Sequence, residues 1–199
     1  MLDLLLQTDI SLFRFINGSL ANPVFDAVMP IVTESKYWMP VYAALFIWLL
    51  WKRRREGAVI CLILALGAVI GDQFNSMWLK EWVGRIRPCH ALEGVRLVGV
   101  WCGSGKSFPS SHAVNNFAAA TLLGYFYPNR RAIWYSIATT VAFSRVYVGV
   151  HYPFDVASGA ALGASIAFVL IVLQQFAAQK NNAFSVVRIK TATITKSES

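Results

Sequence analysis

Charged residues are scarce in this chain of 199 residues, and their scarcity argues against a soluble domain. Asp, Glu, Lys and Arg together make up 14% of the sequence, whereas an average soluble domain carries about 25%. Hydrophobic residues, in contrast, make up 56%. Such a chain can satisfy its backbone hydrogen bonds within a lipid bilayer by forming α-helices. The composition therefore predicts an all-α integral membrane protein, and the length predicts one domain.

Cysteine is also rare, since the chain has only 3, too few for a fold held together by disulfides. Cys61 lies inside an apolar segment and is interpreted as a packing residue. Cys89 and Cys102 flank a polar loop, and they would pair if that loop faces an oxidising compartment. Such a bridge would add about 3 kcal/mol in the chain-entropy model. Two free thiols are the alternative interpretation.

Acidic residues number 10 against 18 basic residues, which gives a formal net charge of +8. The basic residues form short clusters between apolar runs and do not make one continuous surface. We therefore expect no nucleic-acid partner and interpret the clusters as determinants of membrane orientation. The N-terminus does not resemble a secretory signal, because it begins with Asp3 where a signal has a basic region.

Long apolar runs are abundant in this sequence. We predict membrane helices from five of them, at residues 37–51, 57–82, 113–127, 132–150 and 153–178. A span needs about 20 residues, so the shorter runs must extend into their flanks. The last run is rich in Gly and Ala, which favours close contact with a neighbouring helix.

The N-terminal third contains two further apolar stretches, residues 2–16 and 24–32, which are short for a span. We predict that they form helices at the membrane interface or packed against the bundle, with a sixth crossing as the alternative. The fold prediction is thus a membrane-embedded bundle of five or six transmembrane helices over residues 1–180. Residues 181–199 are polar and are predicted to form a flexible tail.

Basic clusters indicate the orientation of the chain. They fall on one side of the membrane if the five runs alternate, and they comprise Lys52–Arg55, Arg130, Arg131 and the cations of the tail. The positive-inside rule makes that side cytoplasmic, together with the C-terminus. The connections on the opposite side then face the periplasm or the cell exterior.

The first candidate site lies on that outer side, at Lys80 and Arg87-Pro88. Lys80 and Arg87 are seven residues apart, about two helical turns, so a helix would place both cations on one face. Pro88 then turns the chain. A lysine and an arginine at a helix end can hold a phosphate from two directions. The alternative is that both side chains reach toward lipid headgroups.

The second candidate site is Pro109-Ser110-Ser111-His112, which follows a long polar loop. Proline and serine favour the start of a helix, where free backbone N–H groups bind anions. His112 in that first turn can donate a proton to a leaving oxygen. Its alternative role is that of a hydrogen-bonded residue at the interface.

The third candidate site consists of Ser144-Arg145, His151 and Asp155. His151 and Asp155 are four apart, so one helical turn would bring them together. A carboxylate that holds one imidazole nitrogen leaves the other free to attack. Helix capping by Asp155 is the alternative. We expect no metal site at His112, His151 and Asp155, because their spacing is not that of ligands and cations surround them.

Together the three patterns, K-x6-RP (80–88), PSSH (109–112) and SR-x5-H-x3-D (144–155), resemble the signatures of the type 2 phosphatidic acid phosphatase superfamily. That family includes bacterial lipid phosphatases, glucose-6-phosphatases and vanadium haloperoxidases. The second pattern departs from the usual PSGH, since Ser111 stands where glycine is common. The backbone N–H at Ser111 can still contact a phosphate.

The resemblance implies a role for each matched residue. His151 would take the phosphoryl group as phosphohistidine, Asp155 would orient His151, and His112 would protonate the leaving group. The phosphate would be held by Lys80, Arg87, Ser110, Ser111 and Arg145. No metal or other cofactor is implied. Arg85 and Lys106 have no matching motif position and are interpreted as residues that tune substrate approach.

The same resemblance implies a lipid phosphatase in the bacterial cytoplasmic membrane with its site facing outward. By analogy we expect undecaprenyl diphosphate as substrate, with phosphatidylglycerophosphate, phosphatidic acid and lipid A phosphate as alternatives. An anion transporter or channel lined by the same cations is the alternative from another class. A haloperoxidase is disfavoured because those relatives are soluble.

Overall fold

The structure is a computed structural model that describes residues 2–103 and 105–180, and its regular elements in that range are all helices. They are α1 (Leu2–Arg14), η1 (Phe15–Ser19), α2 (Pro23–Thr33), α3 (Ser35–Phe74), η2 (Asn75–Leu79), α4 (Lys80–Val83), α5 (Pro88–Ala91), α6 (Ser111–Phe126), η3 (Pro128–Arg130), α7 (Arg131–Tyr147) and α8 (Pro153–Lys180). The prediction for residues 181–199 lies outside the described residues. The all-α prediction is confirmed.

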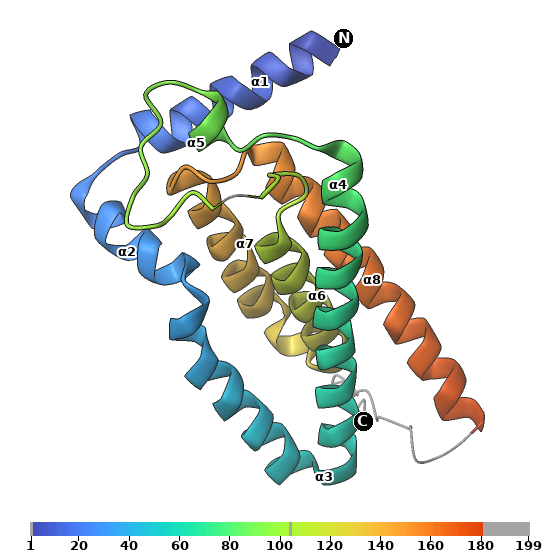
Figure 1. The fold of residues 1–199 in the computed structure, drawn as a ribbon. Coiled ribbons are helices and arrows are strands. Elements are labelled where there is room, and N and C mark those ends of the chain that lie inside the picture. The colour runs from blue at the N-terminus through green and yellow to red at the C-terminus, as the bar shows by residue number, and fades with distance from the viewer. Residues whose placement is uncertain (1, 104, 181–199) are drawn as a thin grey trace, which may run out of the picture.

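Helix α3 consists of two arms joined at a sharp reversal (Figure 1). Arg54 has φ 45° and ψ −112°, far from helical values, so the chain turns back within the basic cluster. Gly57 permits this turn, because a Cβ there would collide with the carbonyl of Leu49 on the other arm. The second arm continues through η2 and α4. The runs predicted at 37–51 and 57–82 are therefore the two arms.

The core of the bundle lies where α6 meets its neighbours, and α6 packs most extensively against α8 and α7. A cluster of buried side chains from the α3 arms, α6 and α8 fills this region, including Ile60, Leu122 and Ala167. Glycines on α8 allow the close approach to α6 that the Gly- and Ala-rich run predicted. A Cβ at Gly159 would lie 2.6 Å from the carbonyl oxygen of Ser110.

Replacing Gly163 with alanine is expected to lower stability, because the added Cβ would collide with the carbonyl of Val114 on α6. Separating two packed helices to relieve such a clash costs about 3 kcal/mol. The measurement is the melting temperature of the detergent-solubilised protein. Gly18→Ala is the matched control, since no atom lies within 4 Å of a Cβ built there. Equal melting temperatures for the two variants would contradict the packing argument.

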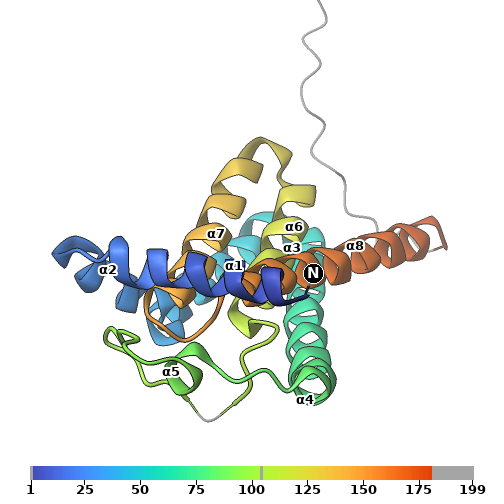
Figure 2. The ribbon, with the colours of Figure 1, turned by 90° about the horizontal axis from the view of Figure 1, so that it is seen from above.

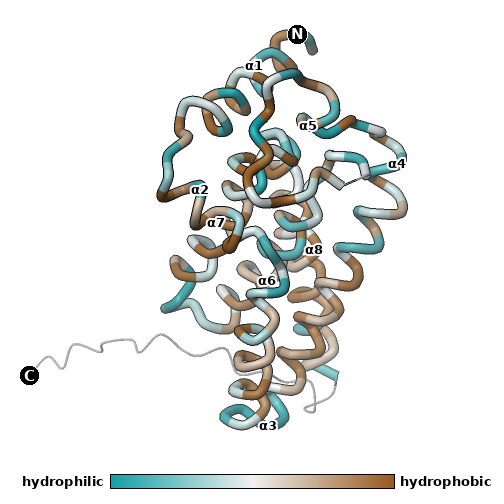
Figure 3. Tube along the Cα trace, turned by 60° about the vertical axis from the view of Figure 1, so that its left-hand side comes forward, coloured by the Kyte–Doolittle hydropathy of each residue, from teal (hydrophilic) through white to brown (hydrophobic). Residues whose placement is uncertain are grey.

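Within residues 2–103 and 105–180, two helical stretches are long and apolar enough to cross a membrane. They are Ser35–Ala91, which contains the reversal at Arg54, and Pro153–Lys180. A third would be the pair Asp3–Ser19 and Pro23–Thr33 counted as one span, although the two are bent by 116°. Helices α6 and α7, with 16 and 17 residues, are shorter than such a span. The predicted count of five or six is thus not confirmed. Apolar residues nevertheless dominate the long helices, as Figure 3 shows.

The N-terminal helices lie across one end of the bundle (Figure 2). Helix α1 contacts α8, and α2 contacts α7. Buried aromatic and aliphatic residues seal these junctions, with Phe13 packed on Tyr152 and Met29 near Tyr147. The same end carries α4, α5 and the turn between α7 and α8 (Figure 1). Packing against the bundle was one of the two placements predicted for the N-terminal helices.

Candidate active site

The structure brings the three candidate motifs together at the end of the bundle covered by α1. Arg87 Nη1, from the first motif, lies 3.5 Å from Nε2 of His151 in the third. The backbone N–H of Ser110, from the second motif, donates to the carbonyl of Asp155 at 3.0 Å. Residues far apart in the chain therefore share one site, as the topology predicted.

His151 lies in the turn between α7 and α8 and is only 2% exposed. Its Nδ1 faces Asp155 Oδ2 at 3.5 Å, and its Nε2 faces Arg87. Burial, followed by the positive charges of Arg145, Arg87 and Lys80, holds the pKa of His151 well below its ordinary value. The imidazole is therefore neutral near pH 7, with Nε2 directed toward the cations.

Because His151 is neutral in the folded protein, acidification is expected to destabilise the fold. The unfolded chain takes up this proton near its ordinary pKa of about 6.5 and the folded chain does not, so stability falls as the pH drops below about 6.5. The slope is at most about 1.4 kcal/mol per pH unit for one such group. His151→Asn should lose less melting temperature than the parent between about pH 7 and pH 5. If the melting temperatures of the parent and of His151→Asn fall equally over this pH range, His151 is not neutral in the folded protein.

Asp155 is fully buried in the first turn of α8. Its Oδ2 accepts the backbone N–H of Tyr152 at 2.8 Å, and its Oδ1 accepts Nη1 of Arg85 at 2.7 Å. The two interpretations of Asp155, as a helix cap and as the partner of His151, are therefore compatible, because the same carboxylate lies against both groups. Asp155 stabilises the start of α8 by accepting the N–H of Tyr152, and the same oxygen, Oδ2, faces His151.

The cations approach from three separate elements. Arg87 is braced by two backbone carbonyls, with Nε donating to Gly105 at 3.1 Å and Nη1 to Val150 at 3.3 Å. Lys80, on α4, interacts electrostatically with Arg87, Arg145 and Asp155. Arg145 Nη1, near the end of α7, donates to the hydroxyl of Thr33 at 2.8 Å. Like charges held together in this way favour an anion between them.

Three buried atoms at the site that can donate a proton lack a hydrogen-bond partner among residues 2–103 and 105–180. They are Nε of Arg145, the hydroxyl of Ser110 and Nδ1 of His151, which lies 3.5 Å from Asp155 Oδ2. Buried polar atoms are normally paired, so an unpaired donor beside a cluster of cations indicates a place for acceptor oxygens. A phosphate supplies several such oxygens.

His112 occupies the first turn of α6, with Nε2 3.4 Å from the hydroxyl of Ser35. Burial, followed by the charges of Arg145, His151 and Lys80, lowers the pKa of His112 to about 3, so this imidazole is neutral near pH 7 when the site is empty. Both imidazoles therefore border the same group of cations. The adjacent Ser111 hydroxyl accepts a hydrogen bond from Asn75 at 2.8 Å.

A groove of about 590 Å³ leads away from His112 between the two arms of α3 and α6. Near His112 its walls are polar, with Ser35, Ser111 and Asn115. Farther along they are apolar, with Phe46 and Leu64 from the two arms. The groove therefore joins a polar site to an apolar channel, an arrangement that suits an amphipathic molecule.

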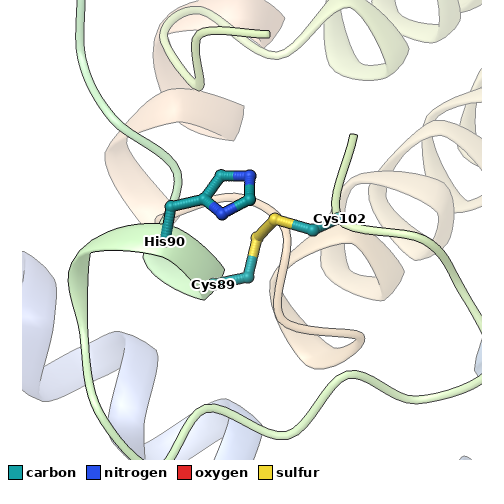
Figure 4. Close-up of side chains that lie close together, drawn as sticks. All are labelled: Cys89, His90 and Cys102. Atoms are coloured by element: carbon teal, nitrogen blue, oxygen red, sulfur yellow. A yellow bond between two sulfur atoms is a disulfide. The ribbon is translucent and has the colours of Figure 1, made fainter. Parts of the chain in front are cut away.

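Cys89 and Cys102 form a disulfide, which confirms the paired interpretation (Figure 4). With His90 they make up the one group of potential metal ligands found in the described part of the chain. Both sulfurs are engaged in the bridge, so this group does not offer thiolates. The bridge closes the loop that follows Arg87.

A sequence profile of the PAP2 superfamily matches residues 60–179, a segment that contains all three motifs. The chain belongs to the PAP2 superfamily. A lipid A 4'-phosphatase of Bacteroides thetaiotaomicron is 33% identical over 174 residues, covering 82% of this chain and 75% of the relative. An undecaprenyl-diphosphatase of Sulfolobus acidocaldarius is 31% identical, covering 83% of this chain and 78% of the relative.

The crystal structure of Aquifex aeolicus LpxE is similar to this PAP2 protein with a TM-score of 0.67 and 27% identity, covering 82% of this chain and 94% of that one. The family and these relatives support a phosphoric ester hydrolase of the membrane. The names of the relatives differ in substrate, so they leave open which lipid phosphate this PAP2 protein uses.

Sequence reasoning missed several residues that support the site. Arg85 was assigned only to substrate approach, yet it binds Asp155 directly. Asp9, Thr33 and Asn75 were not among the predicted site residues. An acidic residue in an apolar helix is costly and often functional. That signal could have singled out Asp9.

Proposed function

We propose that this PAP2 protein removes a phosphate group from a membrane lipid through a phosphohistidine on His151. The observation that carries the proposal is the placement of buried His151, whose Nε2 lies 3.5 Å from Nη1 of Arg87 and whose imidazole also interacts electrostatically with Lys80 and Arg145. A buried, unprotonated imidazole beside Lys80, Arg87 and Arg145 is suited to attack a phosphorus atom whose oxygens those cations hold.

The reaction would proceed in two displacements. His151 Nε2 attacks the phosphorus and the bond to the lipid oxygen breaks, while His112 donates a proton to that oxygen. His112 would take up this proton when the phosphate dianion binds, because the anion offsets the cations that hold the imidazole neutral in the empty site. His112 then removes a proton from water, whose oxygen attacks the phosphorus and breaks the bond to Nε2. Inorganic phosphate leaves, and His151 returns to its starting form. Asp155 faces Nδ1, which carries the proton throughout.

Positive charge around the phosphate is the main source of stabilisation in this proposal. Lys80, Arg87 and Arg145 would share its oxygens, and the unpaired Ser110 hydroxyl and Arg145 Nε would complete the binding. The backbone N–H of Ser111, at the start of α6, would contribute as well. This set of donors makes no use of a metal ion, so we propose a metal-independent hydrolase.

The groove between the α3 arms and α6 supports a lipid as substrate. Its polar end lies at His112, and its apolar walls would receive the part of the lipid nearest the phosphate. The rest of the tail would extend into the bilayer. A soluble phosphate ester would gain nothing from such walls.

We further propose that the site faces the periplasm or cell exterior in a bacterial cytoplasmic membrane. The basic reversal of α3 and the connection between α6 and α7 border one another at the opposite end of the bundle. The positive-inside rule assigns that end, with the end of α8, to the cytoplasm. A disulfide beside the site agrees with an oxidising exterior.

Lipid A phosphate is the first candidate substrate, because a lipid A 4'-phosphatase is 33% identical over most of both chains. Undecaprenyl diphosphate, the expectation from sequence, is the second, on the strength of a relative that is 31% identical. Phosphatidylglycerophosphate and phosphatidic acid complete the panel. The test is phosphate release from each lipid by purified protein with a chelator present, and His151→Ala serves as the blank.

We expect at least one lipid to release phosphate in the presence of the chelator, at a rate well above that of His151→Ala. No release above the blank on any lipid would overturn it. Phosphate uptake by protein-containing liposomes without hydrolysis would instead support the anion transporter. Loss of activity on chelation would disprove metal independence.

A further inference from the structure

Arg85 lies between two buried acidic residues that come from distant parts of the chain. Its Nη1 donates to Asp155 Oδ1 at 2.7 Å, and its Nη2 donates to Asp9 Oδ2 at 2.6 Å. Asp9 belongs to α1 and Asp155 to α8, and both side chains are fully buried. The guanidinium also stacks over the ring of Tyr152, with Cζ 3.8 Å from its centroid.

Asp9 is itself held from a second direction. Its Oδ1 accepts the backbone N–H of Phe154, in the first turn of α8, at 2.9 Å. A carboxylate at that position also interacts favourably with the helix dipole. Asp9 therefore uses one oxygen for Arg85 and the other for the start of the helix that carries Asp155.

We propose that Arg85 and Asp9 are positioning residues that set the orientation of Asp155 toward His151. This inference rests on the proposed function and assigns α1 a part in it. Neither residue touches the phosphate site directly in the structure. Each acts through Asp155, the carboxylate that faces Nδ1 of the nucleophilic imidazole.

The geometry explains why a fork of donors is needed here. Arg85 binds Oδ1 of Asp155, so the other oxygen, Oδ2, is the one that faces His151. A planar guanidinium held by two carboxylates and by a ring face cannot rotate freely. Lysine would keep the charge but would offer no planar fork. Misplacing a catalytic group by about 1 Å can cost about 100-fold in rate.

A second pair of residues in the same protein provides a matched control. Arg96 Nη2 donates to Asp26 Oδ2 at 2.7 Å, which ties α2 to the loop that follows α5. This pair also links an N-terminal helix to a loop arginine, yet it makes no contact with His151 or Asp155. The control pair is more exposed, at 35% and 36% against 18% and 1%, so its loss should cost less stability. If Arg85 and Asp9 only fasten α1 to the bundle, the folded variants of both pairs should nevertheless keep the parental kcat.

The experiment measures kcat and KM for phosphate release from the best lipid substrate in the full-length protein. Arg85→Lys and Asp9→Asn should each lower kcat about 10-fold with KM changed less than about 2-fold. Asp9→Glu, which keeps the charge, should recover part of that loss. Arg96→Lys and Asp26→Asn should leave kcat within about 2-fold of the parent. Melting temperatures report whether each variant is folded.

Three results would overturn the proposal. One is unchanged kcat in folded Arg85→Lys and Asp9→Asn; another is a rise in KM alone. The third is an equal loss of kcat, or an equal loss of folded protein, in the control pair. Failure of the proposed function would look different, because the parent itself would then release no more phosphate than His151→Ala.

Discussion

His151→Ala is expected to reduce phosphate release by at least about 10³-fold on every substrate, because the variant has no atom that can accept the phosphoryl group. The loss should be similar for a lipid phosphate and for an aryl phosphate, because both substrates would transfer their phosphoryl group to the same imidazole. The measurement is steady-state release of inorganic phosphate in detergent. Quenching with alkali should also detect a phosphorylated parent and an unphosphorylated variant, because the phosphorus–nitrogen bond of phosphohistidine is stable in base and labile in acid.

Folding is the control for this result, because His151 is buried and its loss leaves a cavity. His151→Asn fills more of that space and should be equally inactive with a melting temperature nearer the parent. If either variant retains more than about one tenth of the parental kcat, His151 is not the nucleophile.

His112→Ala should produce a large loss that depends on the leaving group. A general acid contributes about 10²- to 10⁴-fold where the leaving oxygen needs a proton. A lipid phosphomonoester leaves as an alkoxide and should therefore lose about 10²-fold or more. An aryl phosphate, whose leaving oxygen is less basic, should lose much less.

The comparison of two substrates separates the two histidines. The ratio of lipid to aryl phosphate turnover should fall in His112→Ala and remain constant in His151→Ala. Equal losses on both substrates in His112→Ala would show that His112 acts in binding or in water activation and does not serve as the acid.

Much of the candidate site could be predicted because its residues occur in three short sequence motifs. Lys80 with Arg87, Ser110 with His112, and His151 with Asp155 are each separated by no more than two helical turns. Each group lies at or near a helix end. The expected continuous helix between Lys80 and Arg87 is wrong, because α4 ends at Val83 and Gly84 takes the left-handed conformation with φ 63°. Tertiary packing, not helical periodicity, therefore brings these two cations together. Apolar runs between basic clusters predicted the helices and the reversal at Arg54. Hydropathy and helix-end residues act locally, so they can be read directly from the chain.

The span count illustrates the limit of that approach. Helices α6 and α7 are 16 and 17 residues long and depend on their flanks to reach across a bilayer. The bend of 116° between the N-terminal helices follows from how they pack on α7 and α8. Apolar length alone does not distinguish an interfacial helix from half of a broken span.

The hydrogen bonds and ion pairs that support the site could not be predicted, because they join residues that are far apart in the chain. Arg85 meets Asp9 across 76 residues and Asp155 across 70, while Arg145 meets Thr33 across 112. The helices and the candidate phosphate-binding residues could be predicted because they depend on residues that are close together in the chain. Which buried acid pairs with which arginine depends on how α1, α2 and α8 dock, because a buried charge is stable only where packing provides its partner.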